Sequence, residues 1–287
     1  MGGMTLIHIG LAGWGDHDDL YAAGTAANRK LAEYAKHFEL VECDSTFYAI
    51  PAADTIAKWI EDTPDNFQFV VKAYQGMTGH RKSDRYYKSN AEQFAAFKTA
   101  IEPIRRANKL AAVLFQYPPW FDCQRKHVDV LRMTKHWMGD WPCALEFRHQ
   151  SWFREELYDQ TISFMKEEQW IHSVCDEPQA GEGSIPIVPI VTDPDRTVVR
   201  FHGRHLDGWV NSGQSNWRDV RYLYRYSESE LREWCDRIHQ LEQQCKQILV
   251  IFNNNSGGDA MHNAKQMMQL LGQLTKPLPP QQMDLFL

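Results

Sequence analysis

The sequence lacks several features that would assign its class at once. No stretch of its 287 residues approaches the roughly 20 apolar residues of a membrane-spanning helix. Its N-terminus lacks the basic region and apolar run of a secretory signal. No two of its six cysteines have CxxC spacing, and Cys43, Cys143 and Cys175 lie inside apolar runs. We therefore expect a cytoplasmic protein with reduced thiols, no zinc knuckle and no membrane partner.

Motifs for common cofactors are also absent. The glycines of "GLAGWGD" (10–16) are spaced wrongly for a nucleotide-binding loop, and no HxH or HExxH sequence occurs. A metal site could form only by convergence of His80, His149 and His202 with Glu146 and Asp176, so a divalent metal stays an open alternative. The net charge of −6 excludes a wholly basic nucleic-acid-binding coat, although not a local basic site.

Eight apolar runs alternate with amphipathic helical segments. Several runs are almost continuously apolar, as in parallel strands buried on both faces. The expected strands are 6–13, 40–46, 67–74, 110–118, 142–149, 170–178, 197–204 and 247–255. Segments such as 28–38, 91–108, 154–169 and 228–244 have helical spacing, whereas the link between the sixth and seventh strands reads as an irregular loop. The pattern predicts a single-domain (β/α)₈ TIM barrel over residues 5–273, with an open doubly wound sheet as the alternative.

Polar residues follow almost every predicted strand. Active sites of such barrels lie at the carboxyl ends of the strands, so these side chains are expected around one mouth. They are Trp14, Asp44, Ser45, Tyr48, Lys72, Gln116, Glu146, Arg148, Asp176, Arg200, His202, Asn253 and Asn254. Each alone has a structural explanation, such as a helix cap or an ion pair. A ring of them favours function, because burying charges without use is costly.

The segment "EFRHQSW" carries the sharpest signal. Glu146 and Arg148 point the same way in a strand and predict a proton-transfer group beside an anion clamp. Lys72 ends "FVVK" and would bind phosphate, or act as a nucleophile if desolvated; the alternative is a buried ion pair with Glu146 or Asp44.

Two loops with basic and aromatic residues are expected to overhang the mouth. One holds Arg81, Lys82, Arg85 and Lys88, and the other, residues 200–226, holds five arginines together with Trp209, Trp217 and Tyr224. This mixture favours a substrate with phosphates and stackable bases, or else forms a lid whose charges are internally paired.

Six motifs occur in a familiar order. "ECDSTFY", "FVVKAY", "LFQYPP", "LEFRHQSW", "VRFHGR" and "IFNNN" resemble those of the domain of unknown function 72 (YecE-like) family, over residues 6–272. The resemblance implies a TIM barrel and a pocket without a defined reaction. It adds His149 to the rim residues, and it departs at Asp44, where the family often has asparagine.

These observations predict an enzyme acting on a phosphorylated substrate, nucleic acid included, by hydrolytic or acid–base chemistry. The expected catalytic residues are Glu146, Lys72, His202 and Asp176. Expected to bind substrate are Asp44, Ser45, Tyr48, Gln116, Arg148, His149, Arg200, Asn253 and Asn254. The alternatives are a sugar-phosphate or small-metabolite isomerase or lyase, and a non-catalytic ligand-binding protein.

The tail, residues 274–287, ends in apolar side chains behind two prolines. "QMDLF" (282–286) resembles the short motif by which bacterial proteins dock on the DNA sliding clamp. Gln282 would hydrogen-bond at a pocket edge, while Met283, Leu285 and Phe286 would fill apolar pockets. The alternative is that the tail packs on its own barrel. The spacer prolines prevent a helix from continuing into the motif.

Overall fold

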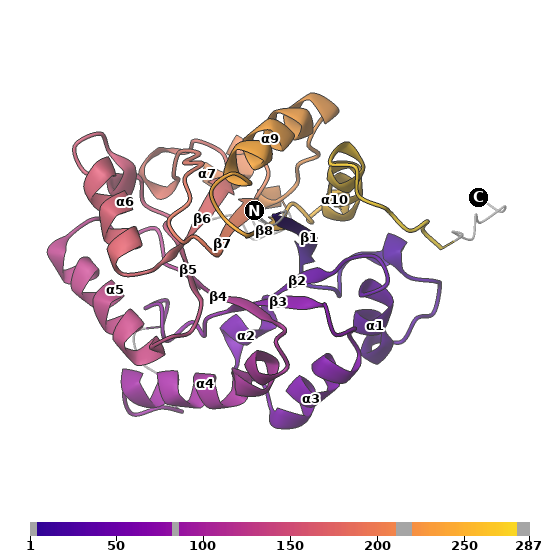
Figure 1. Ribbon diagram of the computed structural model, residues 1–287, viewed down its shortest axis with the longest axis horizontal. Helices are drawn as coiled ribbons and strands as arrows, with labels where there is room; N and C mark the ends of the chain where they lie inside the picture. The colour runs from indigo at the N-terminus through magenta and orange to yellow at the C-terminus, as the bar shows by residue number, and fades with distance from the viewer. Residues whose placement is uncertain (1–4, 82–85, 211–219, 280–287) are drawn as a thin grey trace.

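A computed structural model of the protein describes residues 5–81, 86–210 and 220–279. Eight parallel strands form a closed barrel in sequence order, β1 through β8, and β8 pairs again with β1. Helices surround the strands on the outside (Figure 1). The prediction of a (β/α)₈ barrel is confirmed, and the open doubly wound sheet is excluded by the β1–β8 pairing.

All eight predicted strands are present, and each ends one to three residues earlier than expected. The strands are β1 Leu6–Ala12, β2 Leu40–Cys43, β3 Gln68–Lys72, β4 Leu110–Gln116, β5 Cys143–Glu146, β6 Ile171–Asp176, β7 Arg196–Phe201 and β8 Gln247–Phe252. Their polar ends leave the hydrogen-bonded ladder. Asp44, for example, precedes the short helix α2, and no strand contains it.

The helices lie mostly where the 3.6-residue spacing predicts them. They are α1 Lys30–Tyr34, α2 Ser45–Tyr48, α3 Ala53–Glu61, α4 Asn90–Arg106, α5 Arg125–Met138, α6 Tyr158–Glu167, α7 Leu206–Val210, α9 Glu228–Leu241 and α10 Asp259–Leu270. The link between β6 and β7 holds only a 3₁₀ turn, Gly181–Gly183, as the sequence predicts. Ser227 and Glu230 form a capping box at the start of α9.

Side-chain alternation divides each strand between two cores. One core lies between the strands and the helices, and Val41, Phe69 and Val199 belong to it. The other fills the inside of the barrel with small and aliphatic side chains, namely Ala12, Leu40, Val70, Ala111, Ala112, Leu114, Ala144, Ile171, Val198, Leu249 and Ile251. Because side chains alternate along a strand, the residue two positions after an inward-facing one in the same strand also faces into the barrel.

Gly10 lets β1 and β2 approach closely. It is opposite Leu40 in the parallel register. A Cβ atom on Gly10 would lie 1.9 Å from the Leu40 carbonyl oxygen, far inside van der Waals contact. Any larger residue at this position would therefore clash with the β2 backbone.

No helix in the described ranges, 5–81, 86–210 and 220–279, is long and apolar enough to cross a lipid bilayer.

Candidate functional site

The inward positions above the apolar barrel core carry charges. On β5, Ala144 belongs to the apolar inner layer, and Glu146 follows it two residues later on the same face. On β7, Val198 is likewise followed by Arg200, and His202 comes next on that face. Glu146, Arg200 and His202 are all fully buried. Glu146 therefore points into the barrel as strand parity predicts, and Arg148, two residues later, contacts its carboxylate.

Glu146 is held between two guanidinium groups. Its Oε1 lies 2.5 Å from Nη2 of Arg148, and its Oε2 lies 2.6 Å from Nη1 of Arg200. Ser173 also donates its hydroxyl to Oε2, at 3.2 Å. Burial opposes the charged carboxylate, but Arg148 and Arg200 outweigh burial and hold the pKa of Glu146 well below its usual range. An ionised, doubly paired carboxylate of this kind is an electrostatic anchor and a poor proton donor.

Arg200 joins two strands through a second carboxylate. Its Nε and Nη2 donate to the two oxygens of Glu42 on β2, at 2.8 and 2.6 Å. Its Nη1 already reaches Glu146 and lies 3.5 Å from Oε1 of Gln116. Arg200 is fully buried, so its donors serve protein groups. The expectation that Arg200 touches substrate directly is therefore replaced by a role in holding Glu42 and Glu146.

His202 is neutral and faces the two arginines. Its Nε2 lies 2.9 Å from Nη2 of Arg148 and 3.3 Å from Nη1 of Arg200. The same Nε2 lies 3.5 Å from Oε1 of Glu146. On the other side of the ring, Nδ1 lies 3.1 Å from the amide nitrogen Nδ2 of Asn253. Burial, then Arg148 and Arg200, lower the pKa of His202 well below its usual value.

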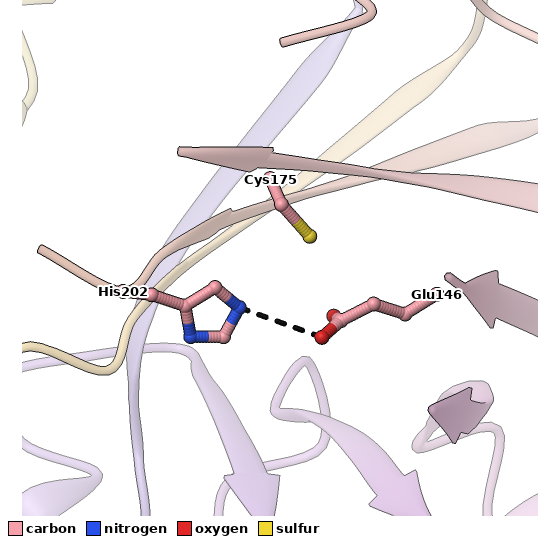
Figure 2. A group of neighbouring side chains, drawn as sticks. All are labelled: Glu146, Cys175 and His202. Carbon is pink, nitrogen blue, oxygen red and sulfur yellow. Dashed lines mark ion pairs between the residues drawn. The ribbon is translucent and has the colours of Figure 1, made fainter. Parts of the chain in front are cut away.

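Figure 2 shows His202 and Glu146 pointing toward each other, with a dashed line between them, and Cys175 of β6 directed toward the space between the two. Ligand atoms of these three buried residues lie within 4.8 Å of one another, and they form the candidate metal-binding group among the described residues. The group does not fit a cation, because guanidinium nitrogens contact the Glu146 carboxylate and Nε2 of His202. Burial and Glu146 also raise the pKa of the Cys175 thiol well above its usual value, which disfavours a thiolate ligand.

A cavity of about 560 Å³ opens above this charged layer, at the carboxyl ends of the strands. Six of its lining residues matter here: Tyr48, Lys72, His80, Gln116, Arg148 and Arg221. The Arg148 guanidinium lies 5.2 Å from the centre of the Trp209 ring, and that of Arg221 lies 4.0 Å from it. Basic groups from β3, the end of β5 and the loop before α9 therefore meet in one cavity.

Lys72 is a permanent cation in this cavity. Its Nζ lies 3.2 Å from Oδ1 of Asp44 and 5.2 Å from the centre of the Phe47 ring. Burial opposes its charge, but Asp44 and Glu42 outweigh burial and raise the pKa of Lys72 above its usual value. Protonated lysine binds anions and has no lone pair for attack, so this environment favours the phosphate-binding alternative over the nucleophile.

Glu42 in β2 and Asp44, just after the end of β2, have carboxyl groups of different acidity. Burial raises the pKa of Glu42 to about 7, against the opposing charge of Arg200. Asp44 has a lowered pKa, because Lys72 and Arg200 outweigh the effect of burial. Two neighbouring carboxyl groups with separated pKa values are a common arrangement for acid and base roles. Glu42 was missed by the sequence reasoning, although its parity with Leu40 and Asp44 would have identified it as inward-facing.

Glu177 is a second residue that sequence reasoning missed. Its Oε2 accepts from Nη1 of Arg148 at 2.6 Å, and its Oε1 accepts from the Ile185 amide at 2.7 Å. Burial raises the pKa of Glu177 to about 7. Glu177 directly follows Asp176 in the chain. Because successive side chains of a strand face opposite sides, Asp176 faces the helices and Glu177 faces inward toward Arg148.

Asp176 requires a correction. It was predicted to face the mouth, but its carboxylate accepts from Arg204 and from the indole of Trp234 on α9. The even positions of β6 face the helices, whereas Ser173 and Cys175 face inward, so Asp176 lies outside the barrel interior. Asn254 is also directed outward and donates to the Tyr224 carbonyl and to Asn263.

The remaining predicted residues are divided between the cavity and its surroundings. Tyr48 lines the cavity, with 61% of its surface exposed, whereas Ser45 is the first residue of α2 and is exposed. His149 pairs with the Ser151 hydroxyl at 2.8 Å. Asn253 reaches the site through His202.

Part of the overhanging loops and the end of the tail lie outside the described residues. These include Lys82, Arg85, Trp217, Gln282, Met283, Leu285 and Phe286. Of the described loop aromatics, Trp209 is 7% exposed, and Tyr224 donates its hydroxyl to Glu230.

Comparison with known proteins identifies the family and agrees with the barrel fold. A Bacillus subtilis protein, UPF0759 protein YunF, is 56% identical over 282 residues, covering 98% of this chain and all of YunF. A crystal structure of a DUF72 family protein from Enterococcus faecalis has a TM-score of 0.89 and 37% identity, covering 97% of this chain and all of that one. Another, from Thermotoga maritima, has a TM-score of 0.80 and 30% identity, covering 93% and 100%. The family model described as "Protein of unknown function DUF72" matches residues 8–284, and this chain belongs to that family.

Proposed function

We propose that this protein is an enzyme that binds a small phosphorylated substrate in the barrel mouth and acts on it by proton transfer. The observation that carries the proposal is the cavity of about 560 Å³ lined by Lys72, Arg148 and Arg221. It lies on the face that carries the active site in TIM-barrel enzymes. Arg148 also has a buried Nε with no hydrogen-bond partner among the described residues. Such a donor is costly unless a ligand satisfies it.

The size and walls of this cavity favour a metabolite over a nucleic-acid strand. Stacking of successive bases requires exposed aromatic faces along a basic groove. Within the described residues, Trp209 is buried beneath the guanidinium of Arg221, and Tyr224 is bonded to Glu230. Trp209 therefore offers no free stacking face, and Tyr48 is an exposed aromatic residue of the cavity lining without a described row of others beside it. A sugar phosphate or similar compound therefore suits the mouth better than nucleic acid.

Asp44 is the group that we assign to proton transfer. Its side chain is 36% exposed and lies beside the Lys72 ammonium, whereas Glu146 is fully buried between two arginines. Asp44 would take a proton from the substrate or from an attacking water. Glu42, with a pKa of about 7, would hold a proton near neutral pH. Lys72 and Arg148 would neutralise the phosphate.

Binding is tested by calorimetric titration of the full chain with inorganic phosphate and a panel of sugar monophosphates. Lys72→Met should weaken phosphate binding by about 10–100-fold, the range for a charged hydrogen bond. Lys58→Met is the matched control, because Lys58 also pairs with an aspartate, at 2.9 Å, but on the surface of α3. Equal binding by wild type and Lys72→Met would contradict the proposal.

Turnover separates an enzyme from a binding protein. Phosphorus and proton NMR of the same panel should reveal a chemical change with the wild type, and Asp44→Asn should lose this change while still binding phosphate. Binding without conversion of any panel member would favour the non-catalytic alternative.

The tail carries a second proposal, docking on a DNA sliding clamp. Residues 273–279 contain neither helix nor strand, and Leu274 is 97% exposed. Gln273 donates to the Ile7 carbonyl, and Lys265 donates to the Lys276 carbonyl. These contacts fix where the segment leaves α10 (Figure 1). A segment without helix or strand, anchored on the barrel through Gln273, Lys276 and Leu278, supports presentation of "QMDLF" as a linear peptide.

A further inference from the structure

The two sides of the barrel mouth differ in charge, one being basic and the other acidic and neutral polar. Lys72, Gln116 and Arg148 come from the ends of β3, β4 and β5. Asp16, Asn255 and Ser256 follow β1 and β8 and line the same cavity. In the closed order of eight strands, the β8–β1 pair lies across the barrel from β4 and β5. A ligand that fills the mouth therefore meets basic groups on one side and a carboxylate with neutral polar groups on the other.

The acidic side continues into a second cavity. This cavity of about 650 Å³ shares Asp16, Asn255 and Ser256 with the mouth and extends along Asp18 and Lys30. It also reaches the start of α10 at Gly258, a position that often binds phosphate in other proteins. Here Asp16, Asp18 and Asp19 line that cavity, and only Lys30 adds a permanent positive charge among its described lining residues. Phosphate is therefore disfavoured on this side.

A buried imidazole in the second cavity lacks good hydrogen bonds. His17 is 2% exposed, and both ring nitrogens lack a well-formed hydrogen bond, although the ring lies near the backbone of Ala12 and Gly13. Such a group is costly to bury and gains when a ligand supplies a partner. It adds a neutral polar group to the side opposite the phosphate.

We infer that the substrate is a polyhydroxylated phosphate monoester, with its phosphate at Lys72 and Arg148 and its hydroxyl groups at Asp16, Asn255 and Ser256. This inference rests on the proposed function. A carboxylate accepts hydrogen bonds from hydroxyls, whereas an amide and a serine hydroxyl can both donate and accept. An ammonium group only donates, so it would use Asp16 but could not accept a hydrogen bond from the Asn255 amide. The mixed set suits a polyol better than an amine.

The test compares three kinds of ligand that all carry a phosphate group. Hexose and pentose monophosphates are titrated into the full chain beside hexyl phosphate, which lacks hydroxyls, and an aminoalkyl phosphate. The wild type should bind at least one sugar phosphate about tenfold or more tightly than hexyl phosphate, because hydrogen bonds to a charged group carry that difference. Asp16→Ala should remove the preference and leave the affinity for hexyl phosphate unchanged.

The outcomes separate this inference from the proposed function. If both ligand types bind equally, Asp16→Ala has no effect and binding still depends on Lys72, the inference fails while the proposed function stands. A stronger preference for the aminoalkyl phosphate also overturns it. If no phosphate binds, the proposed function fails and this inference fails with it. Asp16 is exposed, so Asp16→Ala should have the same melting temperature as the wild type. A large fall in melting temperature would show that Asp16 stabilises the fold and would overturn its assignment as a residue that only binds ligand.

Discussion

Replacement of Arg200 by methionine tests whether the charged layer holds the barrel together. Arg200 is fully buried, and it binds Glu42 at 2.6 and 2.8 Å and Glu146 at 2.6 Å. Methionine fills similar space but leaves both carboxylates without this partner. Removing one member of a buried pair typically costs about 3–5 kcal/mol. Because two carboxylates lose a partner here, we expect about 5 kcal/mol, or a fall in melting temperature of about 10–20 °C.

The loss should also depend on pH. Glu42 already has a folded-state pKa of about 7 beside Arg200, so without Arg200 burial raises it further, and it also raises the pKa of Glu146 from its lowered value. The folded protein then holds protons that the unfolded chain releases, so stability is retained at low pH and lost as pH rises through the folded pKa. The difference between wild type and Arg200→Met should therefore be larger at pH 8.5 than at pH 6. Adding Glu42→Gln should recover part of the loss, because it removes one unpaired charge.

Urea unfolding at both pH values measures these differences, and Arg232→Met is the matched control. Arg232 also lies 2.6 Å from a glutamate, Glu228, but the two side chains are 63% and 57% exposed. An exposed pair of this kind contributes at most about 0.5 kcal/mol. The reasoning is refuted if Arg200→Met costs less than 1 kcal/mol, matches Arg232→Met, or costs the same at both pH values.

Three further perturbations test other parts of the structure. Glu177 has a folded pKa of about 7, above that of the unfolded chain. Between pH 5 and pH 8 the wild type should therefore lose up to about 3 kcal/mol of unfolding free energy relative to Glu177→Gln. Parallel curves of unfolding free energy against pH would contradict this. Gly10→Ala should cost about 1–3 kcal/mol or more in urea unfolding, because its Cβ meets a backbone oxygen, whereas Gly15→Ala has open space and should be neutral. A labelled peptide of residues 277–287 should bind purified sliding clamp, and a double alanine change at its Leu-Phe pair should abolish binding; affinity weaker than about millimolar rejects docking.

Much of the fold was determined by local sequence patterns. Eight apolar runs with helical segments between them predicted the barrel, because each element must bury one face against another. Strand parity predicted that Glu146 and Arg148 share the barrel interior. It would also have shown that Asp176 alternates with Ser173 and Cys175, since both are inward residues of β6. That error came from treating the end of a strand as one group, although successive side chains face opposite sides.

The roles of the charged residues were decided only by the tertiary structure. No local pattern relates Glu42 to Arg200, because 158 residues separate them and barrel closure brings them together. Closure also places Glu146 between two guanidinium groups. Glu146 was predicted to transfer protons, but in this position it is an ionised group that holds the two arginines. The pKa of a carboxyl group depends on burial and on nearby charges, and both are properties of the folded chain. Sequence therefore determined that polar residues follow the strands, whereas packing across the barrel determined which of them are paired and which face the cavity.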